Sequence, residues 1–145
     1  MLISNILRHK SAGKGAAVVT IAPTETIVAL LAVLAEHRIG AVVAVDGDRV
    51  AGIVSERDVV RRLHQRGADV LEATVSDIMT SPVVTCAPDD SVNGVATLMT
   101  DRRFRHMPVL DHDRLVGIVS IGDVVSSRMR GLEQDREHLE QYITG

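Results

Sequence analysis

Aromatic side chains are almost absent from this 145-residue chain, which contains one Phe, one Tyr and no Trp. Single-stranded nucleic acids usually stack their bases on aromatic side chains, so this composition argues against that class of ligand. The formal net charge of -3 also argues against a protein that coats nucleic acid. Small aliphatic residues are abundant instead, and a core of this kind is typical of sheets that are covered by helices.

Cysteine and long apolar runs are equally scarce. Cys86 is the single cysteine, so no disulfide can form within the chain, and we expect a reducing compartment. The longest apolar stretches, such as residues 27–35, are far shorter than the roughly 20 residues that a membrane-spanning helix needs. We therefore expect a cytoplasmic protein without a membrane segment or a secretory signal.

Residue patterns typical of enzymes and metal sites are also missing. The histidines show no metal-ligand spacing with Cys86 or with each other, at positions 9, 37, 64, 106, 112 and 138. The chain contains neither the Gly-x-Ser-x-Gly nucleophile motif nor the Gly-x-x-x-x-Gly-Lys phosphate loop. We therefore expect no catalytic residue, no metal and no catalytic cofactor, and we expect Cys86 to pack in the core.

An internal repeat is the strongest signal in the sequence. Residues 19–60 match residues 84–125 at a constant offset of 65 without a gap, as Pro23 and Pro88 illustrate. About 15 of about 42 aligned positions are identical, which is too many for chance at a fixed register. Two copies are too few for a solenoid, so we expect a pseudo-two-fold pair in which one copy buries a face against the other.

Each copy is predicted to contain the elements β-α-β-β-α in the same order. A first strand runs to a proline, and two further strands are joined by a tight turn. The predicted strands are residues 18–21, 41–45 and 50–54 in the first copy and 83–86, 107–110 and 115–119 in the second. Because helices can cover one face of such small sheets, we predict an α/β (α+β) fold of two copies with a C-terminal helix.

The helices of the two copies are expected at equivalent positions. The first helix follows the proline, and Thr24 and Asp89 are its expected N-caps. The second helix is expected to begin after Ser55 in the first copy and after Ser120 in the second.

Three segments outside the copies complete the predicted organisation. Residues 1–66 hold an N-terminal extension and the first copy, residues 67–125 the connection and the second copy, and residues 126–145 the C-terminal helix. The extension is predicted to be helical over residues 1–10 and a loop through residue 17, and Gly67 is expected to end a helix. The C-terminal helix carries an apolar stripe at Val125, Met129, Leu132, Leu139 and Ile143.

Both copies end in the same junction from strand to helix, residues 52–58 and 117–123. It consists of a Gly, two apolar residues, a Ser, two variable positions and an Asp. This junction resembles the signature of cystathionine β-synthase (CBS) domains, and residues 77–80 and 104–109 are also similar to that family. The resemblance covers residues 3–125 and implies a tandem pair, like small stand-alone bacterial members, that folds as one module with two clefts for adenosine-containing ligands.

The resemblance also implies roles for the residues at matching positions. In CBS pairs the Asp of the junction binds the ribose hydroxyls, and the Ser contacts phosphate or ribose. Backbone and aliphatic side chains from both copies enclose the adenine. One cleft would then consist of Ser55, Arg57, Asp58, Thr80, Val84, Phe104 and Arg105. The other would consist of Ser120, Asp123, Val19, Ile39, Gly40 and, near the phosphate, His106.

The chemistry of the junction agrees with these roles but also has a purely structural interpretation. A carboxylate can accept hydrogen bonds from both ribose hydroxyls, and the free N–H groups of a helix N-terminus attract phosphate. Ser-x-x-Asp is also close to a capping box, which only stabilises the helix start. Both interpretations stay open, since a Ser that caps an empty site can release to a ligand. Arg57 and Arg105 are expected in one pocket, which would be the better anion site.

These features favour a non-catalytic sensor of adenine nucleotides, namely AMP, NAD(H) or ATP, which an unknown protein partner reads. The alternative is a constitutive dimerisation or scaffold protein with vestigial clefts. An enzyme or a nucleic-acid-binding protein, the third class, has no supporting feature. The apolar helix faces exceed what one module can cover, so we also expect a homodimer, the commonest assembly of soluble proteins.

Overall fold

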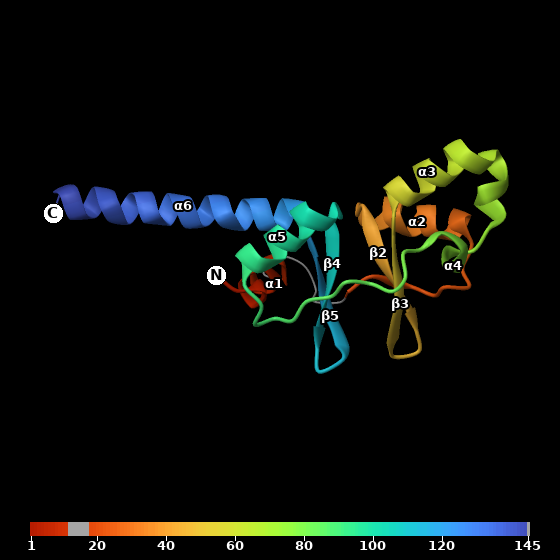
Figure 1. Cartoon of the computed structure of the whole chain (residues 1–145), viewed down its shortest axis with the longest axis horizontal. Helices are drawn as coiled ribbons and strands as arrows, with labels where there is room; N and C mark the ends of the chain where they lie inside the picture. The colour runs from red at the N-terminus through yellow and green to blue at the C-terminus, as the bar shows by residue number, and fades with distance from the viewer. Residues whose placement is uncertain (12–17, 145) are drawn as a thin grey trace. The chain divides into compact units, whose positions relative to one another are not determined.

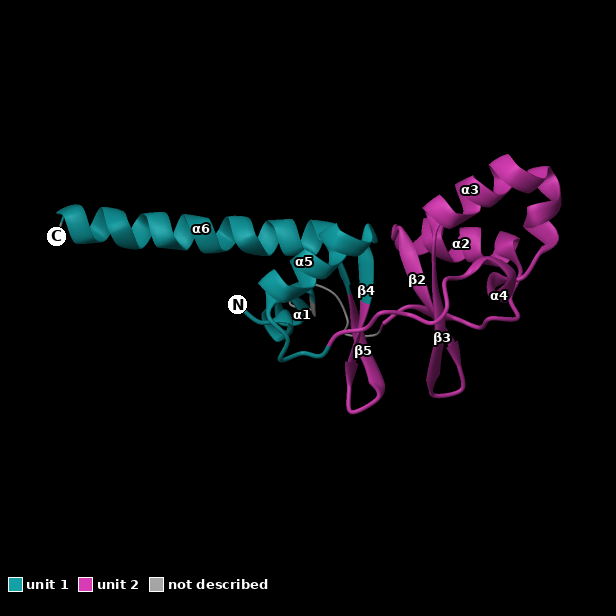
Figure 2. Ribbon diagram, in the orientation of Figure 1, with its two compact units in different colours: residues 1–16, 87–107, 119–145 teal, residues 17–86, 108–118 magenta. Residues whose placement is uncertain are grey.

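The computed structural model describes residues 1–11 and 18–144 of the chain, and Figure 1 shows their helices and strands. These residues form two compact units, which Figure 2 colours separately. Unit 1 comprises residues 1–11, 87–107 and 119–144, and unit 2 comprises residues 18–86 and 108–118. The mixture of helices and small sheets confirms the predicted fold class.

A three-stranded sheet lies in unit 2, in the order β1 (Thr20–Ile21), β2 (Ala41–Asp46) and β3 (Arg49–Ser55). β1 runs parallel to β2, and β2 runs antiparallel to β3. Gly47 turns the chain between β2 and β3 at a φ of 63°, which glycine adopts without steric cost. The first four residues of β2 are apolar and buried, so this strand lies in the core.

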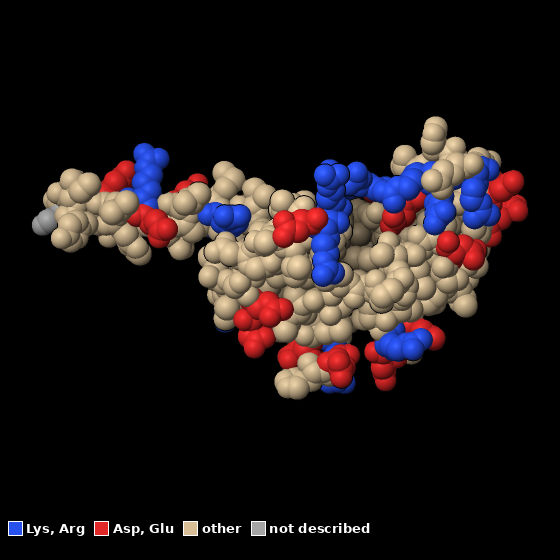
Figure 3. Space-filling view, viewed as in Figure 1, with Lys and Arg blue, Asp and Glu red and all other residues tan. Residues whose placement is uncertain are grey.

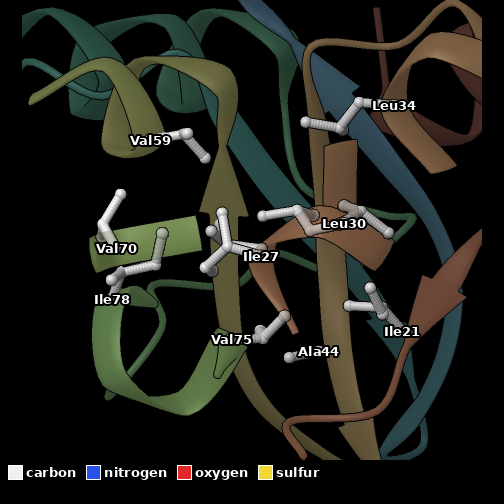
Figure 4. Close-up of a cluster of buried hydrophobic side chains, with 11 residues drawn as sticks. Ile21, Ile27, Leu30, Leu34, Ala44, Val59, Val70, Val75 and Ile78 are labelled. Carbon is white, nitrogen blue, oxygen red and sulfur yellow. The ribbon is translucent and has the colours of Figure 1, made fainter. Parts of the chain in front are cut away.

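Four helical segments pack with this sheet: α2 (Ile27–His37), α3 (Glu56–Arg66), the 3₁₀ helix η1 (Gly67–Glu72) and α4 (Val75–Ile78). Apolar side chains from these helices and from the strands form one buried cluster, which Figure 4 shows. Full burial of a Val, Leu or Ile side chain stabilises a fold by about 1.5–3 kcal/mol. The cluster consists of Ile21, Ile27, Leu30, Leu34, Val42, Ala44, Val54, Val59, Val70, Val75 and Ile78.

The predicted N-caps of the first helices are wrong by two residues. Thr26 and Ser91, not Thr24 and Asp89, cap these helices, and their hydroxyls accept the N–H three residues later at 3.1 and 3.0 Å. In both copies a hydrogen-bonded turn of 3.1 Å occupies the residues around the proline, so the helix begins only after that turn. Gly67 ends α3 as predicted, at a φ of 74°.

A hairpin of β4 (His106–Asp111) and β5 (Arg114–Ser120) forms the second sheet and contributes residues to both units. The strand predicted at residues 83–86 is wrong in extent, because the structure has only an isolated parallel bridge between Cys86 and Val109 there. Pro108 in β4 accounts for the difference: it stands where β2 has Val43, the partner of Thr20 in β1, and it has no N–H to donate.

Unit 1 contains three helices, α1 (Ile3–Ser11), α5 (Val92–Arg102) and α6 (Ile121–Thr144). α1 confirms the helix predicted in the N-terminal extension. The loop predicted to follow it lies outside the described residues. Ile3 and Ile6 of α1 are buried, at 0 and 1% exposure, so this helix belongs to the core of unit 1.

α1 and α4 occupy equivalent places in the two copies, although neither lies within the repeated segments. The Ile3 N–H donates to the Asp90 carbonyl at 2.9 Å, and the Val75 N–H donates to the Glu25 carbonyl at 2.8 Å. Glu25 and Asp90 are themselves equivalent positions of the repeat. Each copy is therefore completed by a helix that comes from outside the repeated segment.

The last helix of the second copy and the predicted C-terminal helix are one continuous helix, α6, of 24 residues. Its apolar stripe is exposed: Met129, Leu132 and Ile143 are 58, 69 and 80% exposed. Acidic and basic side chains are interspersed along α6 in Figure 3. Within residues 1–11 and 18–144, no helix has the length and apolar character that crossing a membrane requires.

Candidate functional site

The first junction starts α3 with a complete capping box. The Ser55 hydroxyl accepts the Asp58 backbone N–H at 3.3 Å, and Asp58 Oδ2 accepts the Ser55 backbone N–H at 2.8 Å. The Ser55 hydroxyl also donates to Oδ2 at 3.1 Å. The other oxygen, Oδ1, lies 3.9 Å from Nη1 of Arg61. These bonds fix the carboxylate at the helix start, while 18% of the Asp58 side chain remains exposed.

The segment that follows α4 lies beside this junction and approaches it most closely at Gly52. Ile53 and Thr80 exchange backbone hydrogen bonds of 3.1 and 2.8 Å, so the residues after α4 run antiparallel beside β3. A Cβ on Gly52 would lie 2.5 Å from Met79 Sδ and 2.9 Å from the Thr80 carbonyl oxygen. Glycine is needed for this close approach, which brings the predicted site residue Thr80 next to the junction.

The start of each junction helix is also bonded to the residue that precedes the neighbouring strand. The Glu56 N–H donates to the Gly40 carbonyl at 2.9 Å, and the Ile121 N–H donates to the Arg105 carbonyl at 2.8 Å. Gly40 and Arg105 are equivalent positions of the repeat, as are Glu56 and Ile121. The two junctions therefore share the same backbone framework.

The second junction repeats the capping bonds and adds an ion pair. The Ser120 N–H donates to Asp123 Oδ2 at 2.9 Å, and the Asp123 N–H donates to the Ser120 hydroxyl at 3.0 Å. Lys10 Nζ of α1 lies 2.9 Å from the same Oδ2. Partial burial alone raises the pKa of Asp123, but the Ser120 N–H and the Lys10 ammonium together lower it by more. The pKa of Asp123 therefore lies below its ordinary value, and the carboxylate is ionised at neutral pH.

The other predicted site residues are distributed over both units. Arg57 in unit 2 and Arg105 in unit 1 are exposed, and His106 in unit 1 is half-buried. The apolar members are half-buried as well and thus remain open to contact with a ligand: Val19, Ile39, Val84 and Phe104. The division of all these residues into two clefts stays a prediction, as does the convergence of Arg57 with Arg105.

Lys10 is the residue at a junction that sequence reasoning missed. It stands 113 positions before Asp123, and helical spacing predicts α1 without predicting where α1 docks. One signal was available: the segment LISNI at residues 2–6 resembles TVSDI at residues 74–78. That likeness identifies α1 as the counterpart of α4 and so places its end near the second junction.

The histidines and Cys86, which were considered as metal ligands, do not form a metal-binding group among the described residues. Within the described part of the chain, no three His, Cys, Asp or Glu side chains are grouped as a metal ion would require. Cys86 is buried, and its Sγ lies 3.8 Å from the Pro108 carbonyl oxygen. Cys86 is therefore part of the core, as the sequence predicted.

Comparison with known proteins identifies two domains of the same family in this chain. The CBS domain family model matches residues 16–65 and 75–130. The CBS-domain protein ATU1752 of Agrobacterium tumefaciens is 40% identical, with a TM-score of 0.82 over 88% of this chain and 99% of that one. PAE2072 of Pyrobaculum aerophilum, solved with AMP, is 29% identical, with a TM-score of 0.72 over 85% and 89% of the chains. The CBS domain pair of MJ0100, solved with 5′-methylthioadenosine and S-adenosyl-L-methionine, is 28% identical, with a TM-score of 0.75 over 92% and 98%.

Proposed function

This chain belongs to the CBS domain family, and we propose that it is a regulatory module that binds an adenosine-containing nucleotide at its junctions. The observation that carries the proposal is the carboxylate of Asp58, which the Ser55 N–H holds at the start of α3 at 2.8 Å. Related CBS proteins were solved with AMP, or with methylthioadenosine and S-adenosylmethionine. These ligands share an adenine and a ribose with two free hydroxyls, so we propose the same two groups as the part recognised.

Asp58 is suited to bind the two hydroxyls of a ribose. Its Oδ2 is already bonded to Ser55, so the carboxylate is oriented before a ligand arrives and little ordering remains to be done on binding. Its Oδ1 faces the exposed Arg61 at 3.9 Å, a distance that leaves room for a hydroxyl donor to compete. Hydrogen bonds to a charged acceptor contribute about 1.5–3 kcal/mol, which is enough to select a ribose.

We assign the phosphate to the cationic residues of the first cleft. The N-terminal N–H groups of α3 favour an anion. Arg57 and Arg105 are exposed, so their guanidinium groups are available for charge-assisted bonds to phosphate oxygens. Val84 and Phe104 would contact the adenine. The candidate residues of the second cleft are Ser120, Asp123, Val19, Ile39, Gly40 and His106, and we propose that they bind in the same way when Asp123 is open to a ligand.

A nucleotide bound in this way would be sensed and not converted. The junction supplies a carboxylate, a hydroxyl and helix N–H groups, which bind a nucleotide without forming an activated nucleophile. We therefore propose a non-catalytic cytoplasmic sensor for AMP or NAD(H), with ATP as a further candidate, that a separate protein partner reads. A constitutive scaffold is the second candidate, and one observation favours it: the capping box of Ser55 and Asp58 is complete without a ligand.

We also propose that two copies of this chain associate through α6. Every residue from 132 to 144 is exposed, whereas an isolated helix of this length is marginal in water. A second α6 would cover the apolar stripe. An antiparallel arrangement is favoured by charge, because Arg128 and Arg130 would then face the acidic half of the partner helix. That acidic half contains Glu133, Asp135, Glu137 and Glu140, of which Glu140 is paired with Arg136 at 3.1 Å.

Thermal unfolding of the full chain with a panel of nucleotides tests the sensor against the scaffold. AMP, NADH and ATP are compared with GMP, which keeps the ribose and phosphate but changes the base. A ligand at 100 times its Kd stabilises a protein by about 2.7 kcal/mol, which raises Tm by roughly 10 °C for a chain of this size. A rise with adenine nucleotides but not with GMP supports the sensor. An unchanged Tm with every adenine nucleotide would favour the scaffold.

A further inference from the structure

The carboxylates of the two junctions have similar exposure but different electrostatic surroundings. The side chains of Asp58 and Asp123 are 18 and 22% exposed, so access to solvent does not distinguish them. Asp123 is paired with Lys10 at 2.9 Å, a hydrogen-bonding distance. The cation beside Asp58 is Arg61, which lies 3.9 Å away and is itself 64% exposed. A loose and exposed pair of this kind is worth little. Lys10 is 40% exposed and lies within hydrogen-bonding distance, so the second carboxylate is the more strongly neutralised of the two.

Lys10 reaches Asp123 because α1 is firmly attached within unit 1. Ile3 and Ile6 are buried on one side of α1, and the Ile3 N–H donates to the Asp90 carbonyl at 2.9 Å. Lys10 stands in the last turn of this helix. The ammonium group is therefore presented by a docked helix, and its position beside the second junction is built into the packing of the unit.

The first copy lacks such a lysine because its counterpart helix ends earlier. α4 ends at Ile78, and the chain continues as an extended segment in which Thr80 pairs with Ile53. By the equivalence of α1 with α4, the counterpart of Thr80 is Arg8, which is still inside α1. In the second copy the extended segment is thus replaced by about one and a half further turns of helix, residues 7–11, and this extension carries Lys10 to the carboxylate.

We propose that Lys10 determines which copy binds the nucleotide: the Asp58 junction takes the ligand, and the Asp123 junction stays closed while Lys10 is paired with it. This inference rests on the function proposed above and specifies where binding occurs. A ribose hydroxyl is a neutral donor, and its hydrogen bond to a carboxylate is weaker than that of an ammonium group. A nucleotide at the second junction must displace Lys10 without replacing its charge, so it binds there more weakly.

Calorimetric titration of the full chain with AMP tests this inference by counting the molecules bound. We expect one AMP per chain for the wild type. Lys10→Met removes the charge and should lower the Kd of the second junction about tenfold, which brings the count to two. Lys10→Arg keeps the charge and should bind one. Arg61→Met is the matched control, since it removes the cation beside the other carboxylate and should leave the count at one.

The second molecule is assigned by a double variant. Asp58→Ala in the Lys10→Met background should retain one AMP per chain, whereas Asp58→Ala alone should lose the AMP that the wild type binds. Thermal unfolding of each variant without ligand verifies that it is folded, and Lys10→Gln, which also removes the charge and should also bind two AMP, replaces Lys10→Met if that variant proves unstable.

The possible failures are distinguishable. If Lys10→Met binds one AMP with the wild-type Kd, Lys10 does not control the second junction and the inference is overturned. If Lys10→Met binds AMP more weakly than the wild type, Lys10 contacts the phosphate, which also overturns it. If the wild type and every variant bind no AMP, NADH or ATP, the proposed function itself fails. The inference that Lys10 determines which junction binds the nucleotide then fails as well.

Discussion

Met79 Sδ lies 2.5 Å from the point where a Cβ on Gly52 would stand. The segment that follows α4 can therefore approach β3 because position 52 has no side chain. The same approach lets Thr80 and Ile53 exchange backbone hydrogen bonds beside the first junction. The Gly of the signature thus has a packing role, whereas its Ser and Asp act at the helix start.

Replacement of this glycine should destabilise the fold. We expect Gly52→Ala to lower the free energy of unfolding by about 1–3 kcal/mol, since the added methyl must displace Met79 and the Thr80 carbonyl. Gly131→Ala is the control, because nothing lies within 4 Å of a Cβ there, and it should stabilise α6 by up to about 1 kcal/mol. Urea denaturation measures both values. Equal effects of the two substitutions would show that the close approach at Gly52 does not exist.

The stability of the chain should depend on the ionisation of Asp123. Its pKa in the folded chain lies below the ordinary value of 3.8. The stabilisation is therefore fully present above about pH 4 and is lost as the pH falls through the folded pKa. We expect Asp123→Asn to flatten the decline in stability below about pH 4, and Lys10→Met to flatten it in part. Urea denaturation at several pH values measures this decline, and identical slopes in all three proteins would contradict the ion pair.

Arg105 should distinguish phosphorylated from unphosphorylated ligands. We expect Arg105→Ala to weaken AMP binding about tenfold and to leave adenosine binding unchanged, because a charge-assisted bond to phosphate is lost. Arg49→Ala, at the exposed first position of β3, removes the same charge from a residue without a proposed role. Calorimetric titration with both ligands measures the difference. An equal loss for AMP and adenosine would assign Arg105 to the structure instead of the phosphate.

The association of two copies should depend on the stripe of α6. We expect a dimer at micromolar concentration for the full chain, a monomer for Leu139→Glu and an unchanged dimer for Gln141→Glu, which lies on the opposite side of the helix. Sedimentation equilibrium measures these states. A full-length monomer would refute the assembly. A chain that ends at Ser127 and still dimerises would place the interface within the CBS copies.

The repeat and the junctions could be predicted from the sequence because they are local patterns at a fixed offset. Gly52, Ser55 and Asp58 recur 65 positions later, and the structure gives both Ser residues the same two capping hydrogen bonds. The helix starts were placed two residues too early, at Thr24 and Asp89, because the turn at each proline competes with the helix for the same residues. Residue spacing does not show whether the turn or the helix forms at these residues.

Contacts between distant segments could not be predicted from residue spacing. The spacing of α1 predicts a helix, but its docking depends on backbone bonds to residues near Asp90, far along the chain. The pair of Lys10 with Asp123 follows from that docking and therefore remained hidden. The stripe of α6 was predicted from the sequence, but the structure shows nothing that covers it among the described residues. Its apolar pattern predicts a buried face, whereas Leu132 is 69% exposed. A pattern identifies a face without identifying what covers it.

The central claim is that the junction carboxylates bind a nucleotide, and calorimetric titration of AMP into the Asp58→Ala/Asp123→Ala double variant tests it most directly. Asp77→Ala is the control, because Asp77 completes the capping box of α4 and has no proposed ligand. We predict that the wild type and Asp77→Ala bind AMP with the same Kd. The double variant should lose about 1.5–3 kcal/mol of binding free energy, at least a tenfold rise in Kd. A folded double variant that binds AMP with the wild-type Kd would contradict the account and leave both carboxylates as helix caps.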